Sequence, residues 1–326
     1  MCKLKISKLL IVQIIQIAII VLLIPFFLIG IVSFFCIVFN KAYFNTSWVI
    51  DTKLAAEFGD FFGGYVGVLF SILSTLLLVY TIIDQFIDRQ KRWATDNFYK
   101  MLEFHNNMVN QLSVDQIDID KNERSDGRSA FVVFKIQIHE LLKLIEEINL
   151  KEKWNLKKDQ RLHIAYMIFY YGIDSSWLSF LQGKIKEDVY INILNKILEK
   201  IQENKKLKLG RSNQTSLSSY FRNMYNFIKL VDNDKYLSKQ EKKSLVTIYR
   251  AQLSNPELYV LFFNLRSYFG KNWNENGYIA RYELLRNIPK DYCDGYDPAD
   301  YYKMRYEYVD YEDITAEAQL TKSLQK

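Results

Sequence analysis

Two long runs of apolar residues lie near the N-terminus. The first, residues 9–39, contains no charged side chain, and neither does the second, residues 61–83. Each run is long enough to cross a bilayer as a helix, which takes about 20 apolar residues. The pattern therefore predicts two transmembrane spans that are joined by a short connecting loop, residues 40–60. A signal peptide is excluded for the first run because its apolar stretch is too long.

Basic residues predict how these spans are oriented. They precede the first span and follow the second: Lys3, Lys5, Lys8, Arg89, Lys91 and Arg92. The connecting loop holds only Lys41 and Lys53, which nearby acidic residues offset. Since cytoplasmic segments carry the excess of Lys and Arg, we expect both termini and the main domain to be cytoplasmic.

A small residue recurs at every fourth position along the second span. These residues are Gly59, Gly63, Gly67, Ser71 and Thr75. Small residues let helix backbones approach closely, which is how helices associate in lipid. Two alternatives stay open. This stripe either packs the two spans of one chain together or joins the second spans of neighbouring copies in a homo-oligomer.

The remainder of the chain has the apolar period of helices. The second span is expected to continue as a helical stalk, residues 85–112, followed by a polar loop, residues 113–128, that has no apolar period. Residues 129–290 show apolar positions spaced by three and four, so they are expected to form a cytoplasmic helical domain. The predicted fold class is all-α, with an N-terminal two-helix transmembrane hairpin followed by a cytoplasmic helical bundle.

Local signals predict a sharp joint between two late helices. Ser238 followed by Glu241 forms a capping box for a helix that ends near Leu253. Asn255 and Pro256 then suit the N-cap and the first turn of the next helix.

Composition and charge narrow the function classes. A net charge of +6 over 326 residues is too diffuse to indicate nucleic-acid binding. Nucleic acid therefore stays a possible but less favoured partner. Cys2, Cys36 and Cys293 lie far apart, so neither a disulfide framework nor a metal site is predicted. Acidic residues gather in the tyrosine-rich tail, residues 291–326, which is either disordered or docked on a basic face.

No catalytic signature is present. The chain has no P-loop, no G-x-S-x-G and no H-E-x-x-H, and its three histidines are not paired at ligand spacing. We therefore predict no catalytic residue, no cofactor and no metal, and a non-enzymatic protein is favoured.

The best candidate site is a set of polar side chains on otherwise apolar helices. Its members are His105, Asn106, Arg222, Asn223, Arg250, Gln252, Ser254, Glu257 and Asn264. We expect Arg250 to pair with Glu257 across the predicted joint, and Arg222 to reach the same carboxylate. The set is either a structural polar network that fixes helix register or a ligand or nuclease site.

Four segments of the sequence resemble a known family. They are FGDFFGG from Phe58, FYKMLEFHNNMV from Phe98, YFRNMYNFIKLVDN from Tyr220 and RAQLSNPELYVLFFN from Arg250. In this order they resemble the phage abortive infection proteins of the AbiC-like family. The resemblance covers most of the chain except residues 151–208.

The resemblance implies bacterial defence in which an infected cell stops phage propagation at its own expense. Together with the predicted spans, it favours a membrane-anchored protein of the bacterial inner membrane. In this interpretation a cytosolic domain senses a phage-derived trigger and is coupled to a membrane effector that depolarises the cell. The alternative is a membrane-tethered enzyme, a nuclease or an enzyme acting on nucleotides, with its active site in the cytoplasmic helical domain.

Overall fold

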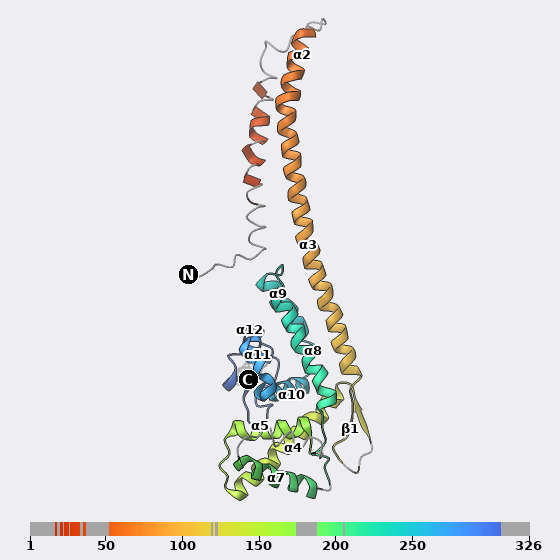
Figure 1. Cartoon of the computed structure of the whole chain (residues 1–326), viewed down its shortest axis with the longest axis vertical. Coiled ribbons are helices and arrows are strands. Elements are labelled where there is room, and N and C mark those ends of the chain that lie inside the picture. The colour runs from red at the N-terminus through yellow and green to blue at the C-terminus, as the bar shows by residue number, and fades with distance from the viewer. Residues whose placement is uncertain are drawn as a thin grey trace, which may run out of the picture. The chain divides into compact units, whose positions relative to one another are not determined.

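The structure is a computed structural model, and it is mostly helical (Figure 1). Apart from parts of residues 17–36, it describes the following ranges: 52–118, 120, 123–173, 188–204 and 206–307. The helical content confirms the all-α class. Most of the first predicted span and most of the connecting loop lie outside the described residues.

Two compact units divide the chain. The first unit is residues 1–96 with 234–238, and the second is residues 97–233 with 239–326. The division falls within the long helix α3, Gly67–Asn110. Each unit is described separately.

In the first unit a helical segment begins with α2, Thr52–Phe61, and passes through a π-helical turn, η1, Phe62–Val66, into α3. Among the described residues one helix, Gly63–Asn110, is long and apolar enough to cross a membrane, and its most apolar window has a mean hydropathy of 2.4. The two-helix hairpin stays a prediction. The π-helical turn, which contains Gly63 and Gly64, was not expected from the sequence.

The second unit is a helical domain built around α10. Its helices are α4 Ser129–Glu152, α5 Lys158–Tyr171, α7 Asp188–Glu203, α8 Gln214–Asn233, α9 Lys239–Arg250, α10 Asn255–Arg266, the 3-10 turn η2 Tyr268–Gly270, α11 Lys271–Glu275, α12 Tyr278–Tyr282 and α13 Pro298–Tyr301. Helix α10 packs against α4 and α5, and its residues from Leu258 to Phe263 are fully buried. A helix that is apolar on all sides is stable in water only when neighbours enclose it, so α10 forms the centre of this domain.

A short β-hairpin corrects the expected polar loop. Strands β1, Ser113–Asp115, and β2, Arg124–Asp126, pair antiparallel, with Val114 opposite Ser125. These two side chains are buried, whereas their strand neighbours are exposed. The sequence pattern missed the hairpin because three residues are too few to show an alternating period.

The described part of the acidic tail docks on the helical domain. The Tyr301 hydroxyl donates to Asp159 Oδ1 at 2.9 Å, and the guanidinium of Arg266 lies 3.9 Å from the centre of the Tyr301 ring. The Tyr296 hydroxyl donates to the carbonyl oxygen of Lys158 at 3.1 Å. Docking therefore holds for these residues, while residues 308–326 lie outside the described part of the chain.

Gly172 provides a test of the packing after α5. Its backbone has φ 74° and ψ −172°, a region open essentially to glycine alone, and a Cβ built there would lie 2.7 Å from the backbone nitrogen of Ser212. We expect Gly172→Ala to lower the free energy of unfolding by about 2 kcal/mol or more, because it adds backbone strain and crowding. Thermal unfolding of the detergent-solubilised chain, followed by circular dichroism, measures the change.

Gly277→Ala is the matched control. Gly277 also has a positive φ, 64°, but a Cβ there would meet no atom within 4 Å. Its loss of stability should be the smaller of the two, and equal losses would contradict the packing argument.

Candidate functional site

A capping box joins α9 to α10. Glu257 Oε2 accepts hydrogen bonds from both the backbone N–H and the hydroxyl of Ser254, each at 2.7 Å. In return, the N–H of Glu257 donates to Ser254 Oγ at 3.4 Å. The N-cap is therefore Ser254 and not Asn255, so the predicted cap was wrong by one residue, while Pro256 does lie in the first turn.

The carboxylate of Glu257 is buried, with the residue 1% exposed. Besides the bonds from Ser254, its Oε1 accepts a hydrogen bond from the Tyr220 hydroxyl at 3.3 Å. Its Oε2 lies 3.9 Å from Arg128 Nε. Burial and the nearby Glu257 charge both raise the pKa of Tyr220, so its phenol stays protonated and donates. A buried charge costs free energy unless it has such partners.

His105, near the C-terminal end of α3, lies beside this carboxylate cluster. Its ring centre is 5.2 Å from that of Tyr220 and 5.1 Å from that of Tyr249, whose hydroxyl lies 3.4 Å from His105 Nδ1. Burial, together with the charge of Arg128, lowers the pKa of His105 to about 4. The imidazole is therefore neutral at physiological pH.

A second contact ties α3 to the same joint. Asn106 Nδ2 donates to Gln252 Oε1 at 2.9 Å. The structure thus brings together five members of the predicted set: His105, Asn106, Gln252, Ser254 and Glu257.

Arg250 belongs to a different cluster. Its guanidinium donates to the carbonyl oxygen of Glu283 at 3.2 Å and lies 3.9 Å from Glu307 Oε2. The expected ion pair with Glu257 does not form among the described residues. Arg250, at the end of α9, bonds to Glu283, and Arg128 lies beside the Glu257 carboxylate instead.

Sequence reasoning missed three members of the network around Glu257. Tyr220 and Tyr249 occupy apolar helix faces, and a hydroxyl on such a face is a usable signal because a buried hydroxyl needs a partner. Arg128 gave no signal, since it is the last residue of the expected polar loop, residues 113–128, where an exposed cation is ordinary.

The other predicted residues lie at or near a cavity of about 430 Å³, here termed the aromatic cavity. Segments α5, α8, α10, η2 and α11 contribute its lining: Tyr170, Tyr171, Gln214, Ser218, Phe221, Arg222, Tyr225, Asn264, Phe269, Asn272 and Trp273. Arg222 therefore lines this cavity and does not bridge to Glu257. Asn223, next to it in α8, has a buried Nδ2 with no hydrogen-bond partner among the described residues.

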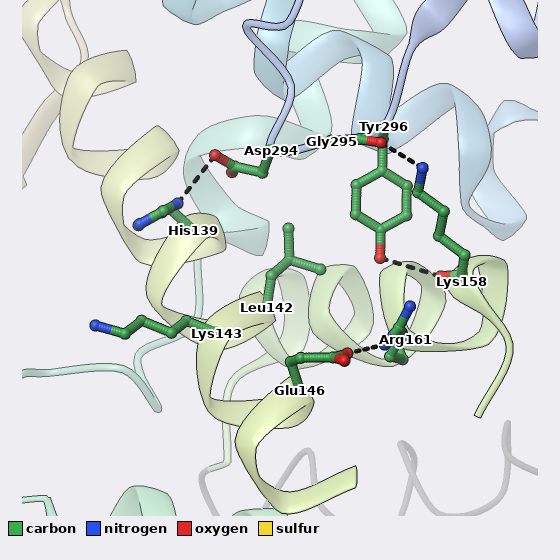
Figure 2. A pocket seen from close by; sticks show the side chains of 9 residues that line it. All are labelled: His139, Leu142, Lys143, Glu146, Lys158, Arg161, Asp294, Gly295 and Tyr296. Carbon is green, nitrogen blue, oxygen red and sulfur yellow. Dashed lines mark hydrogen bonds and ion pairs between the residues drawn. The ribbon is translucent and has the colours of Figure 1, made fainter. Parts of the chain in front are cut away.

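A second, smaller cavity of about 280 Å³ is lined by charged groups that satisfy one another (Figure 2). His139 Nδ1 lies 3.0 Å from Asp294 Oδ1, and Arg161 forms an ion pair with Glu146. Figure 2 shows Lys143 extending away from these pairs. The carboxylates of this cavity, Glu146 and Asp294, already pair with cations, so the cavity offers little to a cationic ligand.

No metal centre is formed by the residues that the structure describes, since no three His, Cys, Asp or Glu side chains converge there.

These observations define a mostly helical protein with one long apolar helix and a buried polar joint. Residues 212–293 match a family model described as "Putative phage abortive infection protein". The match confirms the family resemblance and supports a role in phage defence. It spans α8, α9 and α10, and so covers the joint and much of the aromatic cavity. No curated protein and no solved structure matches the chain.

His105 makes the stability of this network depend on pH. Its pKa is about 4 in the folded chain and 6.5 when unperturbed, so the unfolded chain takes up the proton first as the pH falls. The stabilisation is complete above pH 6.5 and declines towards pH 4, by about 2 kcal/mol between pH 7.5 and pH 5. We expect His105→Gln to show a smaller loss over this interval in urea unfolding of the detergent-solubilised chain.

Part of the acid effect will remain in that variant, because burial also lowers the pKa of His163. His163→Gln is therefore the comparison variant, and it should reduce the acid-induced loss less than His105→Gln does. An equal acid-induced loss in His105→Gln and the unchanged chain would show that another group is responsible.

Proposed function

We propose that the chain is a membrane-anchored bacterial protein that defends against phage by abortive infection. Its helical domain senses infection in the cytoplasm, and its apolar helices act on the inner membrane. The match of residues 212–293 to the abortive infection family carries the defence role. The membrane role is supported by α3.

Helix α3 presents apolar side chains that the described residues leave uncovered. The most apolar 18-residue window of the helix Gly63–Asn110 is only 6% buried. Large side chains of this part are exposed: Val68, Phe70, Ile72, Leu77, Leu78, Val79 and Ile82. An apolar helix in the core of a soluble protein buries such residues, so lipid is the environment that suits this surface.

Three hydroxyl groups of this segment form hydrogen bonds within the helix. The hydroxyls of Ser71, Thr75 and Thr81 donate to the carbonyl oxygens four residues before them, at 2.9, 2.8 and 2.8 Å. In the hydrocarbon core of a bilayer no water is present to satisfy them. These three hydroxyls can therefore lie in lipid without another polar partner.

The orientation is tested with two single cysteines in a chain whose native cysteines are replaced. Lys53→Cys should react with a membrane-impermeant maleimide in intact spheroplasts, because it precedes the span on the outer side. Glu123→Cys, at an exposed residue before β2, should react only after permeabilisation. The reverse pattern would invert the topology and exclude a cytoplasmic sensing domain.

The glycines at the start of the apolar helix favour contact between copies of the chain. A Cβ built at Gly59, Gly63 or Gly64 meets no atom within 4 Å, whereas one built at Gly30 lies 4.0 Å from Phe70 Cζ. Among the described residues, the contact between the two apolar segments joins Gly30 to Phe70, and Gly59, Gly63 and Gly64 take no part in it. Open glycines on a helix in lipid suit the close approach of a second backbone, so we assign the small-residue stripe to a homo-oligomer.

Gly63→Leu tests this assignment. Leucine holds neighbouring backbones apart but is at least as apolar, so membrane insertion should be preserved. Crosslinked oligomers, loss of membrane potential during infection and protection against phage should all be abolished. Gly64→Leu is the matched control, since it places the same side chain on the adjacent open glycine outside the stripe.

The competing arrangement gives a different result. If the stripe packs the two spans of one chain, Gly63→Leu should lower the amount of folded, membrane-inserted protein. Unchanged oligomers together with full protection would exclude the proposed membrane step altogether.

A further inference from the structure

The aromatic cavity is walled by rings whose positions are set before any ligand binds. The ring centres of Tyr170 and Phe269 lie 4.4 Å apart, and those of Tyr225 and Trp273 lie 5.3 Å apart. A volume of about 430 Å³ is in the range of small-molecule sites, roughly 300–1,000 Å³. Aromatic walls of this kind suit a flat ring, which they hold by stacking or edge contacts.

Arg222 is the one charged residue in the lining of this cavity. Its guanidinium makes no ion pair and no hydrogen bond within the described part of the chain, and no carboxylate lines the cavity. Arg222 lines the cavity together with Tyr170 and Tyr225, which belong to the ring wall. An arginine without a carboxylate partner is suited to bind a phosphate or another planar or tetrahedral anion.

Asn264 supplies a buried polar group to the same cavity. The residue is 2% exposed, and its Nδ2 donates to the Tyr166 hydroxyl at 2.7 Å. This bond fixes the amide and leaves its oxygen without a hydrogen-bond partner among the described residues. Asn264 lines the cavity, so its amide oxygen can accept a hydrogen bond from a ligand donor, such as an exocyclic amine.

We propose that the aromatic cavity binds a mononucleotide-type ligand, that is, a small anion carrying one flat heteroaromatic ring. The ring lies between the aromatic walls, its edge meets the Asn264 amide, and its phosphate pairs with Arg222. The second cavity lacks this combination, because its carboxylates are paired with cations and its one aromatic lining residue is Tyr296.

This inference deepens the sensing half of the proposed function, and it rests on that function only where the ligand is taken as a signal. Binding itself depends on the cavity alone. The two can therefore be tested separately.

The experiment uses the full chain in detergent and measures binding by isothermal titration calorimetry. The probes are the four ribonucleoside monophosphates, the matching nucleosides and inorganic phosphate. We expect at least one monophosphate to bind more tightly than its nucleoside and than phosphate, since ring and anion both contribute. Arg222→Gln should weaken that binding by about 10-fold or more, and it leaves folding intact because Arg222 is exposed.

Lys143→Gln is the matched control. It removes the same charge at the second cavity, so the affinity for the monophosphate should not change (Figure 2). Phe269→Leu should weaken monophosphate and nucleoside binding by a similar factor, because it removes a ring wall and leaves Arg222 in place.

Several results would overturn the proposal. They are an absence of binding by every monophosphate, equal binding of phosphate alone, and loss of binding in Lys143→Gln with none in Arg222→Gln. An Arg222→Gln chain that binds weakly but protects fully against phage would overturn only the ligand's role as a signal. The membrane step is judged independently by Gly63→Leu.

Discussion

The buried carboxylate of Glu257 is the constraint around which the helical domain is arranged. A charge that is 1% exposed must be met by donors, and these come from separate parts of the chain. Ser254 begins α10, Arg128 precedes α4, and Tyr220 belongs to α8. Tyr220 in turn packs on His105 of α3. Four helices are thereby held in one register, because displacement of any of them leaves a buried polar group without its partner.

Two helices with similar apolar character lie in opposite environments. The central residues of α10 are fully buried, whereas the most apolar window of the helix Gly63–Asn110 is 6% buried. Both are apolar on all sides, so neither has an amphipathic pattern that identifies its environment. The difference lies in what surrounds each helix: protein encloses α10, and the exposed surface of α3 matches lipid.

The polar residues on the helices serve two different purposes. Those around Ser254 and Glu257 bond to one another, so they act as a structural joint with little left for a ligand. Arg222 and Asn264 line the aromatic cavity, where one charge and one amide oxygen have no protein partner in the described structure. The family-matched residues 212–293 include both features, so the same segment that supports a defence role also carries the proposed ligand site.

The sequence by itself determined the helical class, the long apolar helix, the small-residue stripe and the approximate start of α10. These features depend on the spacing of residues along one segment and on the position of a proline, both of which are local. Only the tertiary structure decided that residues 113–126 contain paired strands, that Ser254 and not Asn255 caps α10, and that Arg250 bonds to Glu283 rather than Glu257. It also divided the predicted polar set between the joint and the aromatic cavity. These outcomes depend on which side chains meet across long sequence separations, such as Asn106 with Gln252, and helix packing sets those distances rather than any local pattern.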